Sequence, residues 1–122
     1  MAHGQITHIE FPADDTDRAR RFYGELFGWK LEEWPNFPGY FLFSTGPAAS
    51  AGGAIGERGK SVGDKLRVYV EVDSIDDVTA RVPELGGTVT TPRTEIPGQG
   101  WYGVVVDPEG TEIGLYEGEA AA

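Results

Sequence analysis

The chain has 122 residues, which suits one domain with its own core and is too short for two independent catalytic domains. Twenty acidic residues against ten basic ones give a net charge of −10, which opposes binding to nucleic acid and to anionic membrane surfaces. There is no cysteine, no apolar leader and no apolar run of membrane-spanning length, so disulfides and thiolate sites are excluded and we expect a cytoplasmic protein.

The first half of the chain predicts one strand, one helix and three further strands. Residues 6–12 alternate, with His8 and Glu10 on one face and Phe11 on the other, as in a half-buried strand. A helix is expected from Asp14 to a stop at Gly28, with an apolar stripe of Ala19, Phe22, Tyr23 and Leu26. Three strands should follow as a meander, at residues 29–34, at residues 40–44 and, more weakly signalled, near residues 53–55.

The second half predicts the same order of elements. Residues 66–73 alternate as a strand, and Ser74 with Asp77 is typical of a helix start. Pro83 should kink or end this helix early. Strands are expected at residues 88–91, 101–106 and 111–116, and residues 91–101 are interpreted as a hairpin connection or as a lid.

A repeat at an offset of 59 residues joins the two halves. It aligns Asp14 with Asp73 and Gly28 with Gly87 and superposes the helix ends without gaps. The sequence therefore predicts an α+β fold of two tandem βαβββ modules within a single domain, residues 1–122. The first module covers about residues 5–56, a linker about 57–65, and the second module about 66–117.

Several segments resemble one known family. The opening HIEFPADDTDRARRFYGELFGWK, the later YVEVDSIDDV and ELGG, and the closing DPEGTEIGLYE are similar to segments of the vicinal-oxygen-chelate superfamily, which includes glyoxalases, bleomycin resistance proteins and extradiol dioxygenases. The resemblance implies two modules whose mixed sheets curve into a cleft with the helices outside. It also implies a homodimer.

The same resemblance makes the family's metal site doubtful. Metal-dependent members place ligands on the first and last strands of each module, and only His8 matches such a position. The repeat carries His8 onto Arg67, which cannot bind a metal, and the last-strand positions fall on Ile55 and Gly114. We therefore expect no cofactor, and a divalent metal is the less favoured alternative.

Strand alternation selects the polar residues that should face the cleft. To these we add Trp101 from residues 91–101, because family members often lay that segment over the ligand. The expected ligand-binding set is His8, Glu10, Arg67, Tyr69, Glu71, Trp101, Glu112 and Tyr116.

Two functions fit this set. The first is a binding protein similar to the bleomycin-resistance branch, which holds a bulky, partly cationic small molecule with carboxylates and with loop aromatics such as Trp34, Tyr40 and Trp101. The second is a lyase or isomerase similar to lactoylglutathione lyase, with His8 as the catalytic proton carrier beside Arg67. A dioxygenase is less favoured, because its iron needs two histidines and a glutamate, and His3 lies near the terminus.

Overall fold

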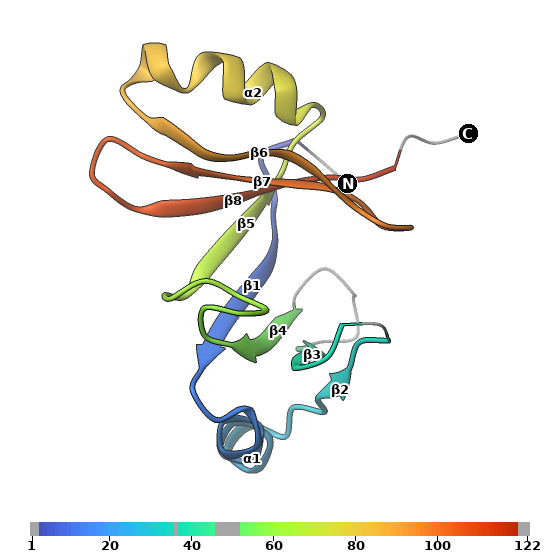
Figure 1. Ribbon diagram of the computed structural model, residues 1–122. Coiled ribbons are helices and arrows are strands. Elements are labelled where there is room, and N and C mark those ends of the chain that lie inside the picture. Colours follow the sequence, from blue (N-terminus) through green and yellow to red (C-terminus); the bar gives the residue numbers. More distant parts are fainter. Residues whose placement is uncertain (1–2, 36, 46–51, 120–122) are drawn as a thin grey trace. The chain divides into compact units, whose positions relative to one another are not determined.

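The computed structural model describes residues 3–35, 37–45 and 52–119, and these fall into two compact units (Figure 1). The first module comprises residues 7–67. The second module comprises residues 68–119 together with residues 3–6. Each module is described by itself below.

The first module contains one helix and a four-stranded mixed sheet. Its elements are β1 (Ile6–Ala13), α1 (Thr16–Phe27), β2 (Glu32–Glu33), β3 (Tyr40–Ser44) and β4 (Gly52–Glu57). In the sheet, β1 pairs with β4 in parallel, and β4–β3 and β3–β2 are antiparallel. The Asp15 side chain accepts a hydrogen bond from the Arg18 N–H and begins α1, and Gly28 ends the helix in a left-handed conformation that favours glycine.

The second module repeats this arrangement. Its elements are β5 (Arg67–Glu71), α2 (Ile75–Arg81), a short 3₁₀ helix η1 (Pro83–Leu85), β6 (Thr88–Ile96), β7 (Gly100–Val106) and β8 (Glu112–Glu117). The strand β5 pairs with β8 in parallel, and β8–β7 and β7–β6 are antiparallel. Strand order and direction thus match the first module element by element, which confirms the duplication predicted from the 59-residue offset.

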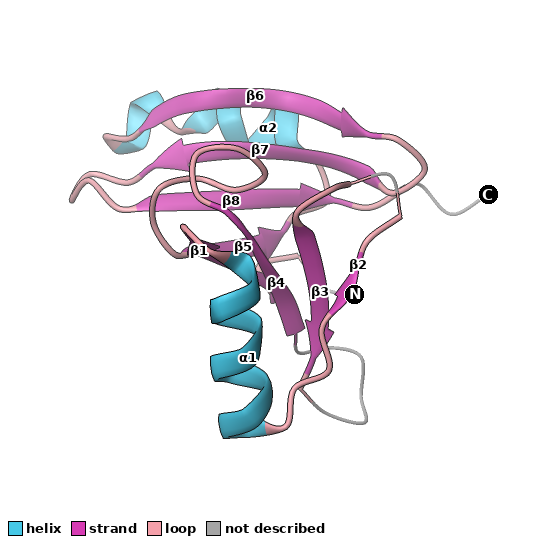
Figure 2. Ribbon diagram, turned by 60° about the horizontal axis from the view of Figure 1, so that its bottom comes forward, coloured by secondary structure: helices cyan, strands magenta, loops and turns pink. Residues whose placement is uncertain are grey.

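Each sheet packs its apolar face against its own helix (Figure 2). In the first module Ala13, Phe43 and Ile55 are buried, with Tyr23 of α1 and Trp29 packed against them. In the second module a corresponding cluster is formed by Val72, Ile75 and Leu115, with Val70, Val78, Trp101 and Val105 around it. The α+β class and the two βαβββ modules are therefore as predicted.

Two details differ from the sequence predictions, and a third decides between two predicted outcomes. Only Ala19 and Tyr23 of the expected stripe on α1 pack inward, whereas Phe22 and Leu26 are 58% and 59% exposed. The helix α2 ends before Pro83, which begins η1, so of the two predicted outcomes the early end is confirmed. Residues 91–96 continue β6, with register shifts on both sides of Thr91, so the segment is mostly strand and only residues 97–99 form the connection.

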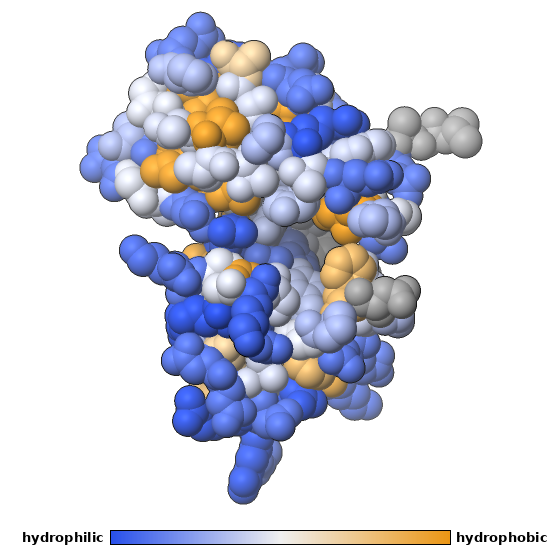
Figure 3. Space-filling view, viewed as in Figure 1, coloured by the Kyte–Doolittle hydropathy of each residue, from blue (hydrophilic) through white to orange (hydrophobic). Residues whose placement is uncertain are grey.

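The surface reflects the acidic composition. In the view of Figure 3, hydrophilic residues cover most of the visible face, and hydrophobic ones occur in small separate patches. Within the described ranges, neither helix has the length and apolar character needed to cross a membrane.

Candidate functional site

A chain of buried polar contacts lies on the first module's sheet face opposite α1. The hydroxyl of Tyr40 on β3 donates a hydrogen bond to Glu10 Oε2 at 2.7 Å, and His8 Nε2 lies 2.8 Å from the same hydroxyl oxygen. Arg67 Nη1 lies 3.9 Å from Glu10 Oε1. Glu10 and Tyr40 are only 7% and 8% exposed, so this is a buried network of polar groups.

Apolar and aromatic groups surround these polar groups. Ala54 is the β4 neighbour of Glu10, and Leu42 is the β3 neighbour of Ala54. Tyr40, Ala54 and Val62 form a buried cluster on this face, with Trp34 and Phe37 packed against it. The rings of Trp34 and Phe37 stack at 4.3 Å between centroids. A buried carboxylate, a guanidinium, an imidazole and a phenol therefore share one sheet face with an aromatic pair.

The tautomer of His8 follows from the single proton of the Tyr40 hydroxyl. Because that proton is donated to the Glu10 carboxylate, the contact between His8 Nε2 and the Tyr40 oxygen requires the N–H on His8 Nε2. Burial lowers the pKa of His8 from 6.5 to about 4, because the apolar surroundings disfavour the imidazolium. His8 is thus neutral at physiological pH, with its Nε2–H directed at Tyr40.

Tyr40 is the residue that sequence reasoning misplaced. The sequence analysis counts Tyr40 among the loop aromatics, whereas Tyr40 begins β3 and is buried at the centre of the contacts just described. The alternation of residues 40–44 does carry the missing signal, because it puts Tyr40 and Leu42 on one face and Phe41 and Phe43 on the other.

In the second module, four of the predicted residues lie on the sheet face opposite α2. Tyr69 and Glu71 are the β5 partners of Gly114 and Tyr116 on β8. The Tyr116 hydroxyl donates to the Gln99 carbonyl oxygen at 2.5 Å, and burial, followed by the charge of Glu71, raises the pKa of Tyr116. Glu112 begins β8 and has the strand parity of Tyr116.

Trp101 lies on the other face of this sheet. It packs against the cluster of Val72, Ile75 and Leu115, and the guanidinium of Arg93 lies 4.0 Å from the centre of its ring. The sheet separates this side chain from the polar face that carries Tyr116. Trp101 therefore packs in the core beside α2, on the face that the alternation of β7 predicts for it.

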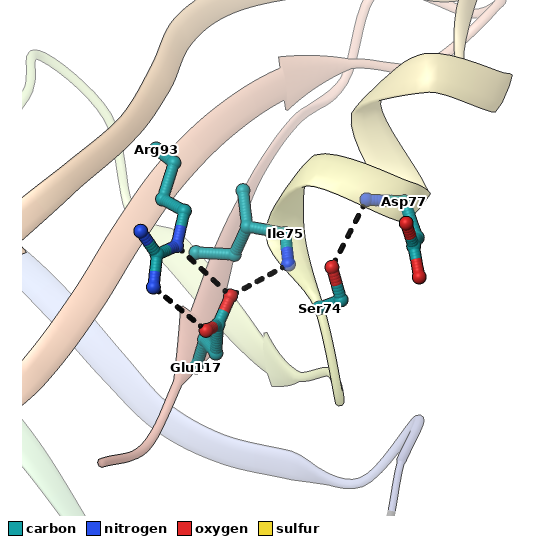
Figure 4. A network of polar contacts seen from close by, with 5 residues as sticks. All are labelled: Ser74, Ile75, Asp77, Arg93 and Glu117. Carbon is teal, nitrogen blue, oxygen red and sulfur yellow. Dashed lines mark hydrogen bonds and ion pairs between the residues drawn. The ribbon is translucent and has the colours of Figure 1, made fainter. Parts of the chain in front are cut away.

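Arg93 also belongs to a polar network that fixes the start of α2 (Figure 4). Its Nε and Nη2 donate to the two carboxylate oxygens of Glu117 at 3.2 and 3.0 Å, and the Ile75 N–H donates to Glu117 Oε1 at 2.8 Å. The hydrogen bond from Arg93 is the main cause that lowers the pKa of Glu117. Ser74 completes the start of the helix by accepting from the Asp77 N–H. This network joins β6, β8 and α2, and we interpret it as structural.

The residues at the family's ligand positions do not fit a divalent ion. The alternation of β4 puts Ile55 in the helix-side core, 0% exposed, so the residue on the polar face is Ala54, which has no donor atom. On β8 the corresponding Gly114 is covered by the Tyr69 ring, into which any added Cβ would collide. Arg67 is a permanent cation paired with Glu10. Across the described ranges, no three His, Asp or Glu side chains come together in a metal-binding group.

Comparison with known proteins gives a family match over part of the chain and a curated relative. Residues 5–46 match the family described as "Bleomycin resistance protein-like N-terminal". The protein CFP32 of Mycobacterium tuberculosis, provisionally described as a glyoxylase, is 27% identical over 119 residues, which cover 93% of this chain and 46% of CFP32. The chain thus spans about half the length of this curated relative.

Solved structures share the fold at low sequence identity. A glyoxalase/bleomycin resistance protein/dioxygenase superfamily member from Vibrio splendidus superposes with a TM-score of 0.67 at 13% identity, covering 90% of this chain and 96% of that one. The Mn(II)-bound glyoxalase from Novosphingobium aromaticivorans gives 0.67 at 16% identity, covering 98% of this chain and 42% of that one.

Proposed function

We propose that the chain is a member of the glyoxalase/bleomycin resistance protein/dioxygenase superfamily and that it binds a small organic ligand on a polar sheet face, without the superfamily's full metal site. The binding groups proposed here are His8, Glu10, Tyr40 and Arg67 of the first module. The other predicted contacts on the face opposite α2, namely Tyr69, Glu71, Glu112 and Tyr116, remain predictions. Trp101 packs on the α2 side of that sheet and is not among the binding groups proposed here.

The burial of Glu10 is the observation that carries this proposal. Removing a carboxylate from water costs several kcal/mol unless other groups compensate, and folding stability alone is served as well by an apolar residue. Here Tyr40 and Arg67 contact the carboxylate, and the Tyr40 ring packs against Trp34, which stacks on Phe37. An ionised carboxylate next to aromatic faces suits a ligand with a cationic or strongly hydrogen-bond-donating group.

Proton transfer by His8 is the second candidate function. Neutral His8 can accept a proton, and the cation of Arg67 lies on the same small network. However, a general base works best when its pKa lies near the operating pH, and burial holds the pKa of His8 at about 4. This mismatch favours binding over lyase or isomerase chemistry.

Thermal unfolding in the presence of chosen probes tests the proposal. Metal-free bleomycin should raise the Tm of the protein by mass action, and Glu10→Gln should remove most of that shift. Glu84→Gln is the matched control, because Glu84 lies in an exposed ion pair with Arg81 and should leave the shift unchanged. Neither Mn²⁺, Ni²⁺, Zn²⁺ nor Fe²⁺ should stabilise the protein.

Three outcomes would count against it. A metal-dependent rise in Tm would restore the metalloenzyme alternative. If metal-free bleomycin still raises the Tm of Glu10→Gln, the ligand binds at another place on the protein. Conversion of the methylglyoxal–glutathione adduct by the wild type, lost in His8→Ala, would establish the lyase.

A further inference from the structure

The chain that follows β4 folds back onto the first module. The Glu57 carbonyl oxygen accepts hydrogen bonds from the N–H groups of residues 60–62, at 3.0 to 3.3 Å. The Gly59 N–H donates to the Val62 carbonyl oxygen at 3.0 Å. Residues 57–62, which the sequence predicts as part of a linker, therefore form a closed turn, and we call them the β4 turn.

Val62 and Tyr40 lie side by side above Gly56 on β4. A Cβ added at Gly56 would lie 2.6 Å from Val62 Cγ1 and 3.4 Å from Tyr40 Cδ1. Gly56 is the β4 partner of Tyr40, so this added Cβ would point to the face opposite α1, which is also the face of Glu10. Glycine at this position therefore lets the β4 turn lie directly on the polar face.

Val62 belongs to this polar face and not to the core beside α1. It is 7% exposed and lies in one buried cluster with Tyr40 and Ala54, which is separate from the cluster that packs on α1. Ala54 is the β4 neighbour of Glu10, and Gly56 follows it on the same face, about 7 Å along the strand. A ligand group that starts at the Glu10 carboxylate and extends along the Tyr40 ring therefore meets Val62 next.

Hydrogen bonds fix Val62 in this place. Ser61 Oγ accepts from the Glu57 N–H at 2.8 Å and donates to the Gly39 carbonyl oxygen at 3.1 Å. The β4 turn is thereby tied both to the end of β4 and to the residue before β3. Because the backbone of Val62 is also bonded within the turn, its side chain forms a fixed wall.

We propose that Val62 is a specificity-determining residue, which closes the polar face beside Tyr40 and limits the size of the apolar group that a ligand can carry next to its cationic group. This inference rests on the function proposed above. A valine side chain offers apolar contact and no hydrogen bond, so this wall favours an alkyl or aromatic substituent over a polar one. The ligand class is thus a compact organic cation.

Two quaternary ammonium probes of different size give the test. In calorimetric titrations, the wild type should bind benzyltrimethylammonium roughly ten-fold more tightly than (1-naphthylmethyl)trimethylammonium, because the larger ring collides with Val62. Val62→Ala removes two methyl groups and should abolish most of this difference by raising the affinity for the naphthyl probe. Val62→Ile extends the wall and should weaken binding of the benzyl probe several-fold.

Val72→Ala is the matched control. Val72 is a valine with nearly the same exposure, 6% against 7%, in the core of the second module. Its truncation should cost similar stability and leave the ratio of the two affinities unchanged, and circular dichroism would verify that each variant folds.

Glu10→Gln separates failure of this inference from failure of the proposed function. If binding of the probes depends on Glu10 but neither Val62 variant changes the ratio of affinities, the role of Val62 is wrong and the proposed function stands. An equal change of the ratio in Val72→Ala would also overturn the role of Val62. If neither probe binds, or if binding survives Glu10→Gln, the proposed function is wrong and this inference falls with it.

Discussion

The Tyr40 hydroxyl has one proton and two polar neighbours, and this sets the local chemistry of the first module. Replacing Tyr40 by Phe keeps the ring against Trp34 and removes the donor to buried Glu10. We expect the free energy of unfolding to fall by about 1–3 kcal/mol, because the carboxylate loses a hydrogen bond it cannot replace with bulk water. Urea unfolding at pH 7 measures this.

Tyr23→Phe provides the comparison for Tyr40→Phe. Tyr23 packs beside Trp29, and its hydroxyl has no hydrogen bond within the described part of the chain. Its loss should therefore change stability little. Equal effects of the two substitutions would show that the Tyr40 hydroxyl is not a partner of Glu10.

The burial of His8 predicts how stability depends on pH. The pKa of His8 is about 4 in the folded chain and near 6.5 when unfolded, so below pH 6.5 the unfolded chain binds the proton more readily. The protein should lose about 3 kcal/mol through this residue as pH falls from above 6.5 to 4, and nothing through it above pH 7.

A comparison of wild type with His8→Gln separates the pH-dependent stability due to His8 from that due to the carboxylates. Both proteins lose stability in acid, but the wild type should lose more between pH 6.5 and 4. An NMR titration of the His8 ring should give the low pKa directly. A midpoint near 6.5 would contradict the burial of this imidazole.

At the scale of the element, the start of α2 depends on a residue at the end of β8. Glu117→Gln removes the ionised partner of Arg93 while keeping an acceptor for the Ile75 N–H. We expect a lower Tm at pH 7, and a larger loss than in Glu84→Gln, whose ion pair is exposed.

The sign of the pH effect follows from the lowered pKa of Glu117. Its folded pKa lies below the ordinary value of 4.5, so its contribution is present above pH 4.5 and is lost as pH falls through the folded pKa. The difference between wild type and Glu117→Gln should therefore shrink in acid below pH 4.5. A difference that stays constant from pH 7 to pH 3 would exclude an ionic contribution.

On β8, Gly114 is needed so that the Tyr69 ring can lie across the strand. Gly114→Ala should destabilise the protein by about 1–3 kcal/mol, because the added Cβ collides with that ring. Gly118→Ala is the control, since its Cβ would lie 3.7 Å from the Tyr116 ring, an ordinary contact. Chemical unfolding of both variants gives the comparison.

Elements could be predicted where alternation or caps were strong. The faces of β1 followed from His8, Phe11 and their neighbours, and the end of α1 from Gly28, whereas its start, expected at Asp14, lies at Thr16. The strand β4 is rich in glycine and alanine, so its face could not be deduced, and Ile55 was placed on the wrong side. Phe22 and Leu26 were assigned to the core because helical spacing does not distinguish an inward stripe from a second, outward one.

At the scale of the whole molecule, charge should govern ligand choice. With a net charge of −10, binding of metal-free bleomycin should weaken several-fold between roughly 0.05 and 0.5 M NaCl, as the screening length shortens. Calorimetry at several salt concentrations measures the change. The affinity for a neutral aromatic ligand should not depend on salt. If the affinity for bleomycin is also independent of salt, charge attraction does not contribute to its binding.

The duplication was visible in the sequence because caps and glycine stops recur at a fixed offset. The contacts at the candidate site were not visible. The alternation of one strand, β1, was enough to identify His8 and Glu10. Tyr40, which contacts both, lies about thirty residues away on β3, and β3 comes close to β1 only because both strands pair with β4. Sequence patterns identify the face a residue occupies, whereas its partners depend on register.

The second module is assembled from two segments that are far apart in the sequence, residues 3–6 and 68–119. The Gly4 N–H donates to the Glu71 carbonyl oxygen at 2.7 Å, and the Glu71 N–H donates to the Gln5 carbonyl oxygen at 2.8 Å. On the ribosome, residues 3–6 are made first, yet their partners emerge only after the whole of residues 7–67. The contacts of the first module can thus form while synthesis continues, and those of the second wait until β8 has been translated. Deleting residues 1–6 should therefore destabilise the second module, although residues 7–67 separate the two segments in the chain.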